Sequence, residues 1–511
     1  MCVTFRAMMD SHVVHRFRWV YCQLEILRHC LPPSVRGILD ELPATLDETY
    51  ERILRGINRS NREHAHRLLQ CLTVAIRPLQ VEELAEVLAI DFDATCQVGS
   101  PKLNVDWRLA DQNYAVLSAC SSLIAIVDDG DSQVVQFCHF SVKESLTSDR
   151  LARSCADVSL YHVLLEPSHT TLAQACLGVL LRLDDRVAQD NAREFPLAEY
   201  AARHWFYHAR FENVSQRVQV AMELLFDVGK PHFAAWLRVH DVDKQWVWFS
   251  SFSRTRCAGP LYYAAHCGFY DLAKRLIAKY PEHVNARGGW KVTPLGAALY
   301  GNHLQVAELL YNHGADVHVR GHENDTLLHA VAVHNPIDTV LWLLDHGADV
   351  NTPNDRLFTP LHRAAFYELH EVVGVLLVHN ADIHAKNVNG EVPLHLAACS
   401  LRDYAENDID EVSPDQRVDL LRTMQLLLDH GADVNARAND GATPLHHSSF
   451  RGIGRGSYGD MGILEGTRLL LEHGADIDAE NNEGQTPLDV ALAFGRHKMV
   501  RFLLEHGARG Q

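Results

Sequence analysis

Histidine is the residue that recurs most clearly at fixed positions in this chain, which has 511 residues and 32 histidines. Imidazole nitrogens bind metal ions and transfer protons, so regularly placed histidines first suggest a metal site or an acid–base centre. Ten of them fall into two groups, one after a Pro-Leu or Leu-Leu turn and one before Gly-Ala or Asn-Ala: His329, His362, His395 and His446, then His313, His346, His379, His430, His473 and His506. Because identical positions in repeated units serve the repeat, we expect these histidines to hydrogen-bond the backbone between units and to hold no metal.

A glycine-rich run, Gly454-Arg-Gly-Ser-Tyr-Gly459, matches the GxGxxG spacing of a dinucleotide-binding loop. Such a loop must follow a β-strand and needs an acidic residue about 20 positions further on. Here it follows a helix-like segment, and the downstream Asp476 belongs to a repeated Gly-Ala-Asp motif. The patterns GxxxxGK(S/T), GxSxG and HExxH and the EF-hand loop do not occur. The sequence therefore predicts no nucleotide binding, no catalytic centre and no cofactor.

Composition limits the class of protein further. The twelve cysteines form no CxxC pair, which excludes zinc ribbons and thioredoxin-type motifs and favours free thiols in a reducing compartment. The formal charge of −18 disfavours attraction to nucleic acid or to an anionic membrane. No apolar run approaches the roughly 20 residues of a membrane span, and the N-terminal segment has no signal-peptide core. We expect a cytoplasmic location, with a nuclear one as the alternative.

The repeated histidines lie in a unit of 33 residues, which is clearest at residues 359–386. Thr359-Pro-Leu-His predicts a tight turn that enters a helix, since proline is tolerated in the first helical turn. Apolar residues at helical spacing predict a second helix from Glu371, and Asn380 follows it where sister units carry glycine. Positions equivalent to Thr359 recur at intervals of 33, 33, 33, 51 and 43 residues: Thr293, Thr326, Val392, Thr443 and Thr486.

A 33-residue period with a T-P-L-H turn is the signature of ankyrin repeats, and residues 257–511 resemble an array of about seven such repeats. One helix pair cannot bury both of its apolar faces, so each pair is expected to stack on the next. Two insertions, at 401–417 and 451–461, are expected between the two helices of a unit. They are surface loops by this reading, with a partner contact as the functional alternative.

Ankyrin arrays bind proteins through their finger tips and the exposed side of each first helix. The resemblance therefore implies that function lies in residues that vary between units. Finger-tip candidates are Trp290, Lys291, His322, Arg356, Phe358, Arg437 and Asn439. First-helix candidates are Tyr300, His334, Phe366, Tyr367 and His447. Several adjacent units must contribute, because a specific interface buries about 800 Å² on each partner.

The N-terminal segments FRWVYCQL (17–24) and LPATLDETY (42–50) resemble the closing part of the NACHT-type nucleotide-binding module of STAND signalling proteins. By itself this region predicts only helices, including one that starts at Thr45 or Asp47. Members of that family carry a P-loop well before this segment. No P-loop occurs in these residues, so we expect the chain to hydrolyse neither ATP nor GTP.

Residues 63–150 predict a small winged-helix domain, and RPLQVEELAEVLAIDF and FCHFSVKESL resemble the winged helix that follows the nucleotide module in the same family. The expected elements are helices at 63–74, 81–89 and 141–146 and a hairpin of strands 123–127 and 134–139. Winged helices often bind DNA. Here the 81–89 helix presents Glu82, Glu83 and Glu86 and no basic residue, which repels phosphates. Packing against neighbouring domains is the preferred role.

Residues 151–256 predict a helical bridge with aromatic patches at 196–211 and 232–243. Trp205, Phe206 and Tyr207 could stack a ligand, but no convergent polar set accompanies them. A hydrophobic seam that joins these helices to the first ankyrin unit is therefore the better interpretation.

These segments predict a mainly α chain: a helical tail (1–62), a winged-helix domain (63–150), the bridge (151–256) and an α-solenoid of about seven ankyrin repeats (257–511). The expected function is a non-enzymatic intracellular protein-binding scaffold. One alternative is a regulatory subunit that depends on a nucleotide-binding domain supplied upstream or by association with related STAND proteins. DNA binding through the winged helix is the less favoured alternative.

Overall fold

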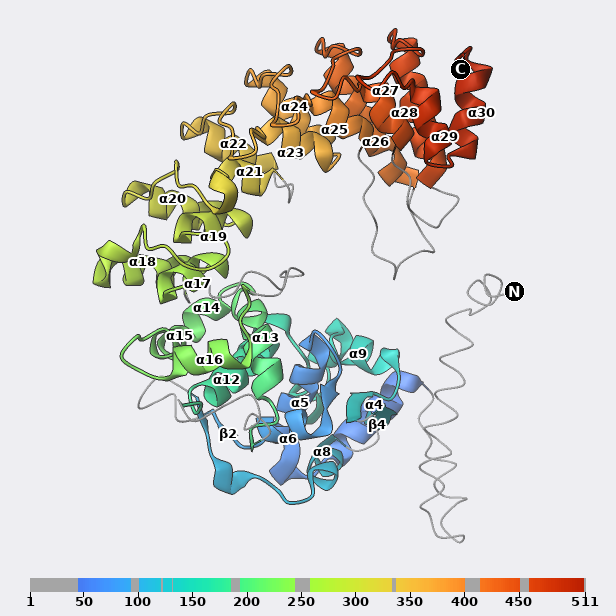
Figure 1. Cartoon of the computed structure of the whole chain (residues 1–511). Helices are drawn as coiled ribbons and strands as arrows, with labels where there is room; N and C mark the ends of the chain where they lie inside the picture. The colour runs from blue at the N-terminus through green and yellow to red at the C-terminus, as the bar shows by residue number, and fades with distance from the viewer. Residues whose placement is uncertain are drawn as a thin grey trace. The chain divides into compact units, whose positions relative to one another are not determined.

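The computed structural model describes residues 45–92, 101–120, 123–130, 132–184, 194–243, 258–332, 337–399, 414–450 and 459–509. The chain divides into two compact units, residues 1–250 and 251–511, each with its own core (Figure 1). Several expectations fall outside the described residues. These are the resemblance at 17–24, the glycine-rich run that starts at Gly454, and His334.

The first unit is mainly helical with short strands. Its elements are α4 (Leu46–Gly56), η2 (Arg59–Asn61), α5 (Arg62–Val74), β1 (Leu79–Gln80), α6 (Val81–Val87), β2 (Ile90–Asp91), β3 (Lys102–Leu103), η3 (Val105–Trp107), α8 (Gln112–Cys120), β4 (Ile124–Asp129), β5 (Ser132–Phe137), α9 (Phe140–Leu146), α10 (Asp149–Ala152), α11 (Ala156–Ser159), α12 (Leu165–Leu180), α13 (Ala198–Ala209), α14 (Val214–Arg217), α15 (Gln219–Leu225) and α16 (His232–Val239).

The winged-helix elements expected in this unit are confirmed. α5, α6 and α9 are the three expected helices, and β4 pairs antiparallel with β5 in the register Ile126 opposite Val135. Gly130 takes the left-handed conformation that the hairpin turn requires (φ 63°). The strand order β1-β5-β4 includes β1, and β2 pairs with β3. Neither pairing was expected, because two-residue strands carry no periodic signal.

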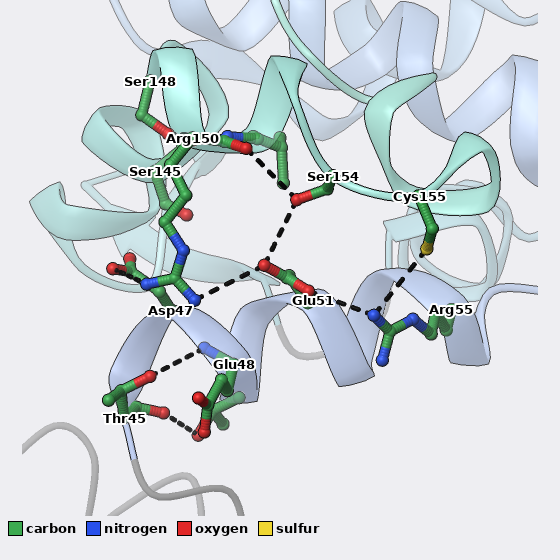
Figure 2. Close-up of polar contacts among 12 residues, drawn as sticks. Thr45, Asp47, Glu48, Glu51, Arg55, Ser145, Ser148, Arg150, Ser154 and Cys155 are labelled. Atoms are coloured by element: carbon green, nitrogen blue, oxygen red, sulfur yellow. Dashed lines mark hydrogen bonds and ion pairs between the residues drawn. The ribbon is translucent and has the colours of Figure 1, made fainter.

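Helix α4 is fixed by a polar seam to α10 and to the residues that directly follow it (Figure 2). Arg150 Nη1 donates to Asp47 Oδ2 (2.5 Å), and its Nη2 lies 3.5 Å from Glu51 Oε1. Glu51 also accepts from Ser154 Oγ (3.3 Å) and from Arg55 Nη2 (3.1 Å). Asp47 and Arg150 are about half exposed, so solvent weakens these ion pairs. The seam orients α4, while the buried Tyr50 and Leu54 anchor it.

Trp205 lies in a cluster of buried aromatic side chains within this unit. Trp205 and Trp236 are fully buried, with ring centroids 5.5 Å apart at 79°, and Phe226 lies 6.1 Å from Trp205. Trp236 Nε1 donates to the Ala202 carbonyl (2.9 Å), which satisfies its polar atom. Tyr207 differs from expectation because it is 56% exposed. The helix buries only the face on which Trp205 lies.

Helix α6 does not present all three of its carboxylates, so that expectation is wrong. Glu83 and Glu86 are each 2% exposed, and only Glu82 faces solvent. Glu83 pairs with Arg77 (2.6 Å), and Glu86 pairs with Arg108. Buried carboxylates need such partners, and the sequence of the helix alone cannot show which arginines supply them.

The second unit is a row of helix pairs, confirmed as an α-solenoid (Figure 1). Its elements are α17 (Pro260–His266), α18 (Tyr270–Lys279), η6 (Pro281–His283), α19 (Pro294–Tyr300), α20 (Leu304–Asn312), η7 (His322–Asn324), α21 (Leu327–Val331), α22 (Ile337–Asp345), α23 (Pro360–Phe366), α24 (His370–Val378), α25 (Pro393–Cys399), α26 (Pro414–Asp429), α27 (Pro444–Phe450), α28 (Gly459–Glu472), α29 (Pro487–Ala493) and α30 (His497–Glu505).

Each first helix of this unit packs on the first helix of the next repeat, from α17 through to α29. Leu361, Ala364 and Ala365 are fully buried in that contact, as expected for a small apolar face. Asn380 ends α24 in the left-handed conformation (φ 64°) that Gly347 has one unit earlier (φ 87°). The two insertions begin after α25 and after α27, within a unit as expected, but residues 414–417 belong to α26 and residues 459–461 to α28, so these parts are helix and not loop.

Candidate protein-binding surface of the repeat array

The four histidines that follow the turns, His329, His362, His395 and His446, hold neighbouring repeats together, as expected. In the central unit, His362 Nδ1 accepts from the Thr359 N–H (3.1 Å) and Nε2 donates to the Glu391 carbonyl of the next repeat (3.1 Å). The same Nε2 contact recurs from His329 to Phe358 O (2.9 Å), from His395 to Ala442 O (3.1 Å) and from His446 to Gln485 O (3.0 Å). These bonds require a neutral ring with its proton on Nε2. Burial lowers the pKa of His362 and of His395 to about 4, which keeps them neutral.

The six histidines that end second helices differ from expectation. His379 Nδ1 donates to the Val375 carbonyl of its own helix (2.9 Å), and the other five make the same contact four residues back. These backbone bonds therefore close the C-terminal turn of one helix. Of the six, His346 also reaches the preceding repeat, where its Nε2 lies 3.3 Å from Glu308 Oε2. Among the residues that the structure describes, no three His, Cys, Asp or Glu side chains are placed to hold a metal ion.

The fingers are the extended segments that precede the first helices, residues 316–326, 349–359, 382–392, 433–443 and 476–486. A ladder of backbone hydrogen bonds joins them. One backbone N–H of each finger donates to a carbonyl of the preceding finger: Asp355 to Glu323 (2.9 Å), Val388 to Arg356 (3.0 Å), Asn439 to Asn389 (2.8 Å) and Asn482 to Asp440 (2.9 Å). The ladder fixes the spacing and direction of successive tips, so their side chains form one preorganised edge.

Three adjacent side chains on this edge form what we call the finger-tip patch: Arg356, Leu357 and Val388. Leu357 is 47% exposed and Val388 is 48% exposed. The guanidinium of Arg356 is held by Glu323 Oε1 of the preceding finger (2.6 Å) and is itself largely exposed. Arginine is a frequent anchor of protein interfaces, and the exposed aliphatic groups beside it add apolar surface that a partner can cover.

Leu357 has a strained backbone at the centre of this patch. Its φ is +56°, in the left-handed region that a side chain with a Cβ avoids. The equivalent positions in four other fingers are Asn324, Gly390, Gly441 and Gly484, all with positive φ, whereas the finger before Thr293 carries Lys291 there. An exposed leucine in a column of glycines suggests a role outside folding. Sequence reasoning missed Leu357 and Val388, although alignment of the units would show a leucine in the glycine column.

Three of the expected finger-tip residues serve the stack. The Arg437 side chain donates to the Glu480 carbonyl of the next finger. Lys386 makes the equivalent contact one finger earlier, where its Nζ donates to the Arg437 carbonyl (3.3 Å). Asn439 Nδ2 donates to Val388 O (2.9 Å). The Phe358 carbonyl accepts the imidazole bond of the preceding repeat, and its ring is half-buried. A partner-binding role for these residues stays a prediction.

Lys291 is not on the exposed edge, so its expected position is wrong. It is 7% exposed, and its Nζ lies 3.3 Å from the ring centroid of the half-buried Tyr300. A lysine can bury its ammonium in this way because the face of an aromatic ring attracts a cation. The neighbouring Trp290 is 45% exposed, and His322 is also exposed, as expected of tip residues.

The described first-helix candidates are all half-buried. The rings of Phe366 and Tyr367 lie 5.2 Å apart, edge to face. His447 Nε2 lies 3.8 Å from Glu391 Oε1, and burial lowers the pKa of His447 despite that carboxylate. These residues offer partial surfaces beside the fingers, and the finger-tip patch is the more exposed apolar surface.

The buried polar groups of the first unit form structural contacts. Ser141 Oγ lies 2.6 Å from His139 Nδ1, a spacing that suits a nucleophile and its base, but Ser141 is 4% exposed and His139 caps α9. His208 contacts His169 and Tyr200, each at 2.9 Å, and is fully buried. Burial raises the pKa of the Cys71 thiol to about 12, so this thiol is unreactive.

Comparison with known proteins identifies domains on both units. Residues 261–354 and 416–511 match ankyrin repeats (3 copies), residues 343–397 match ankyrin repeats (many copies), and residues 389–439 match a single ankyrin repeat. Residues 34–157 match the winged-helix domain of GPI inositol-deacylase. No described helix has the length and apolar character needed to cross a bilayer.

Two curated proteins are similar to parts of the chain. Azaphilone pigments biosynthesis cluster protein L of Monascus ruber is 32% identical over 297 residues, which cover 55% of this chain and 61% of that protein. Alpha-latrocrustotoxin-Lt1a of Latrodectus tredecimguttatus is 41% identical over 58 residues, or 11% of this chain and 4% of the toxin. The chain thus spans less than two thirds of the length of either relative. Together, fold and comparisons identify a chain that carries a winged-helix domain of the GPI inositol-deacylase type and an array of ankyrin repeats.

Proposed function

We propose that the chain is a non-enzymatic protein-binding scaffold that holds its partner at the finger edge, centred on the finger-tip patch. The observation that carries this proposal is Leu357, an exposed leucine held at positive φ where four other units carry glycine or asparagine. The ladder of backbone bonds keeps the neighbouring tips rigid, so a partner does not have to order them.

The side chains of the edge suggest the chemistry of the partner. Leu357 and Val388 supply apolar contacts at the centre. Toward the C-terminus the exposed tips are acidic, with Asp440 and Glu483 at equivalent positions in their fingers. A partner with an apolar anchor and basic residues on one side would match both features.

Affinity capture with matched variants tests this function. The variant Leu357→Gly/Val388→Ser removes the apolar anchors and keeps the backbone conformation of the tips. The control Val378→Ser removes a side chain that is 74% exposed on α24, outside the finger-tip patch. We expect quantitative mass spectrometry to show that the wild type and the control capture the same partners. The amount captured by the tip variant should be lower by about tenfold or more. Equal capture by all three proteins would contradict the proposal.

A second proposal concerns regulation: the chain associates with a NACHT-type STAND relative that supplies the nucleotide-binding domain. It is supported by the winged-helix match at residues 34–157, which includes the segment 42–50 that resembles the end of a NACHT module. The test is nucleotide hydrolysis by such a relative with and without this chain. A change in its turnover, with none from the chain alone, is expected. No change at saturating chain would exclude this regulation.

A further inference from the structure

A pocket of about 220 Å³ lies in the first unit, away from the repeat array. It is formed by α6, by the segment that follows η3, by α8 and by residues just before α13. The side chains that matter for its chemistry are Glu82, Glu86, Trp107, Arg108, Leu109 and Glu194. Pockets for drug-sized ligands run from about 300 to 1,000 Å³, so this one suits a single side chain.

The floor of the pocket is a neutralised ion pair. Glu86, 2% exposed, receives a hydrogen bond from Arg108 Nη2 at one oxygen and one from the Leu197 N–H at the other (2.7 Å). Arg108 also lies over the ring of Phe195, 5.4 Å from its centroid. The guanidinium is therefore engaged with groups of its own unit, and its charge is balanced by Glu86.

Two further carboxylates give the pocket a net negative charge. Glu82 and Glu194 are exposed residues that line it, and among the described residues neither has an ion-pair partner. With Glu86 and Arg108 cancelling, the lining carries two unbalanced negative charges. Such a site attracts a cation and repels an anion.

The rim adds an aromatic face and aliphatic surface. Trp107 is 51% exposed and Leu109 is 56% exposed, and both line the pocket. Val105, 41% exposed, lies two residues before Trp107. Three large exposed apolar side chains within five residues form an apolar patch of the kind that marks an interaction site. Among aromatic side chains, tryptophan binds a cation best.

We propose that this pocket is a second protein-docking site, one that takes an arginine side chain of a partner segment in which apolar residues flank the arginine. The guanidinium stacks on Trp107 and donates to Glu82 and Glu194, while the flanking residues cover Leu109 and Val105. Arginine fits better than lysine because its planar fork can stack and hydrogen-bond carboxylates at the same time.

Selection from an unbiased display library of random dodecapeptides tests the occupant directly. The full chain is the target. A counter-selection on the variant Glu82→Gln/Trp107→Ala/Glu194→Gln discards peptides that bind elsewhere on the chain, including those that bind the repeats. We expect the enriched peptides to share an arginine next to apolar residues. No enrichment, or enriched peptides without a shared arginine, would overturn the proposal.

Affinity measurements on one enriched peptide sharpen the result. Replacing its arginine by citrulline, which keeps the shape and removes the charge, should weaken binding by about tenfold or more, as should Glu82→Gln/Glu194→Gln in the protein. The control Glu144→Gln/Glu212→Gln removes the same charge at two exposed residues outside the pocket and should leave affinity unchanged. If the pocket variant and the control variant weaken binding equally, the carboxylates act only by long-range attraction. If the chain self-associates and the pocket variant abolishes this association, the occupant is a second copy of the chain. Either result would overturn the proposal.

Discussion

His362 in the repeat array and His208 in the first unit are both fully buried, neutral imidazoles, yet they are held in different ways. His362 makes contacts that recur at the same positions of three other repeats. His208 lies between His169 and Tyr200 in an arrangement that is not repeated among the described residues. A repeated contact can be recognised from spacing, whereas a unique one depends on segments far apart in the chain. The two units should therefore respond differently to substitution.

The largest effect is expected from Trp205→Ala in the first unit. Removal of this fully buried ring should lower the free energy of unfolding by about 3–5 kcal/mol. Hydrogen exchange should show lost protection across α12, α13 and α16 together, because they share one core, and little change in the repeats. Tyr207→Ala, on the exposed face of the same helix, is the control and should change little. Equal loss of protection in the repeats would contradict the separation into two units.

His362→Ala should have the next largest effect. It leaves a buried N–H and the Glu391 carbonyl without partners, which costs about 2–3 kcal/mol. Because a repeat contacts only its neighbours, exchange should rise mainly in α23 and α25. His379→Ala, which removes one bond within a helix, should cost about 1 kcal/mol or less. A larger loss for His379 than for His362 would reverse the roles assigned to the two groups of histidines.

Acid should weaken the repeats through the same histidines. Burial lowers the pKa of His362 to about 4, so between that value and about 6.5 the unfolded chain binds more protons than the folded one. The free energy of unfolding is then highest above about pH 6.5 and decreases as the pH is lowered. At pH 5 this residue should account for a loss of about 2 kcal/mol. His362→Asn removes the titrating group and can retain the cap, so the urea midpoint of the variant should fall less between pH 7 and 5. A slope unchanged by His362→Asn would contradict this assignment.

A smaller effect of opposite sign is expected from Leu357→Gly. Glycine adopts the observed φ of +56° without strain, so relief of strain should stabilise the repeats by up to about 1 kcal/mol while partner capture is lost. Val388→Gly, at a neighbouring tip where φ is not positive, is the control for loss of a side chain and should not stabilise. Loss of stability with Leu357→Gly would show that the leucine is there for folding.

Arg437→Ala should have the smallest effect. Its hydrogen bond to the Glu480 carbonyl is solvent-exposed, so its loss should lower stability by about 0.5 kcal/mol. If Arg437 serves only the stack, partner capture should be unchanged. A strong loss of capture with stability intact would restore Arg437 as a binding residue.

The repeats could be predicted from the sequence because their determinants are local and periodic. The Thr caps, the Pro-Leu turns and the left-handed Asn380 each follow from a residue type at a fixed place. The prediction for Lys291 was wrong because its burial depends on Tyr300, on the helix that follows. In the first unit, Glu83 and Glu86 were misplaced for a similar reason: their arginine partners lie outside their own helix. Contacts made by a residue once, at a distance in sequence, leave no pattern to read.

The ladder of the fingers has one more consequence. Asn439 is bonded to Asn389 across 50 positions of sequence, with the same geometry that joins fingers 33 residues apart, because the extra residues lie between the helices of a unit. Whole units can thus be gained, and loops lengthened, without disturbing the frame on either side. A gene that duplicates one repeat could lengthen its binding edge in a single step and leave every older contact in place.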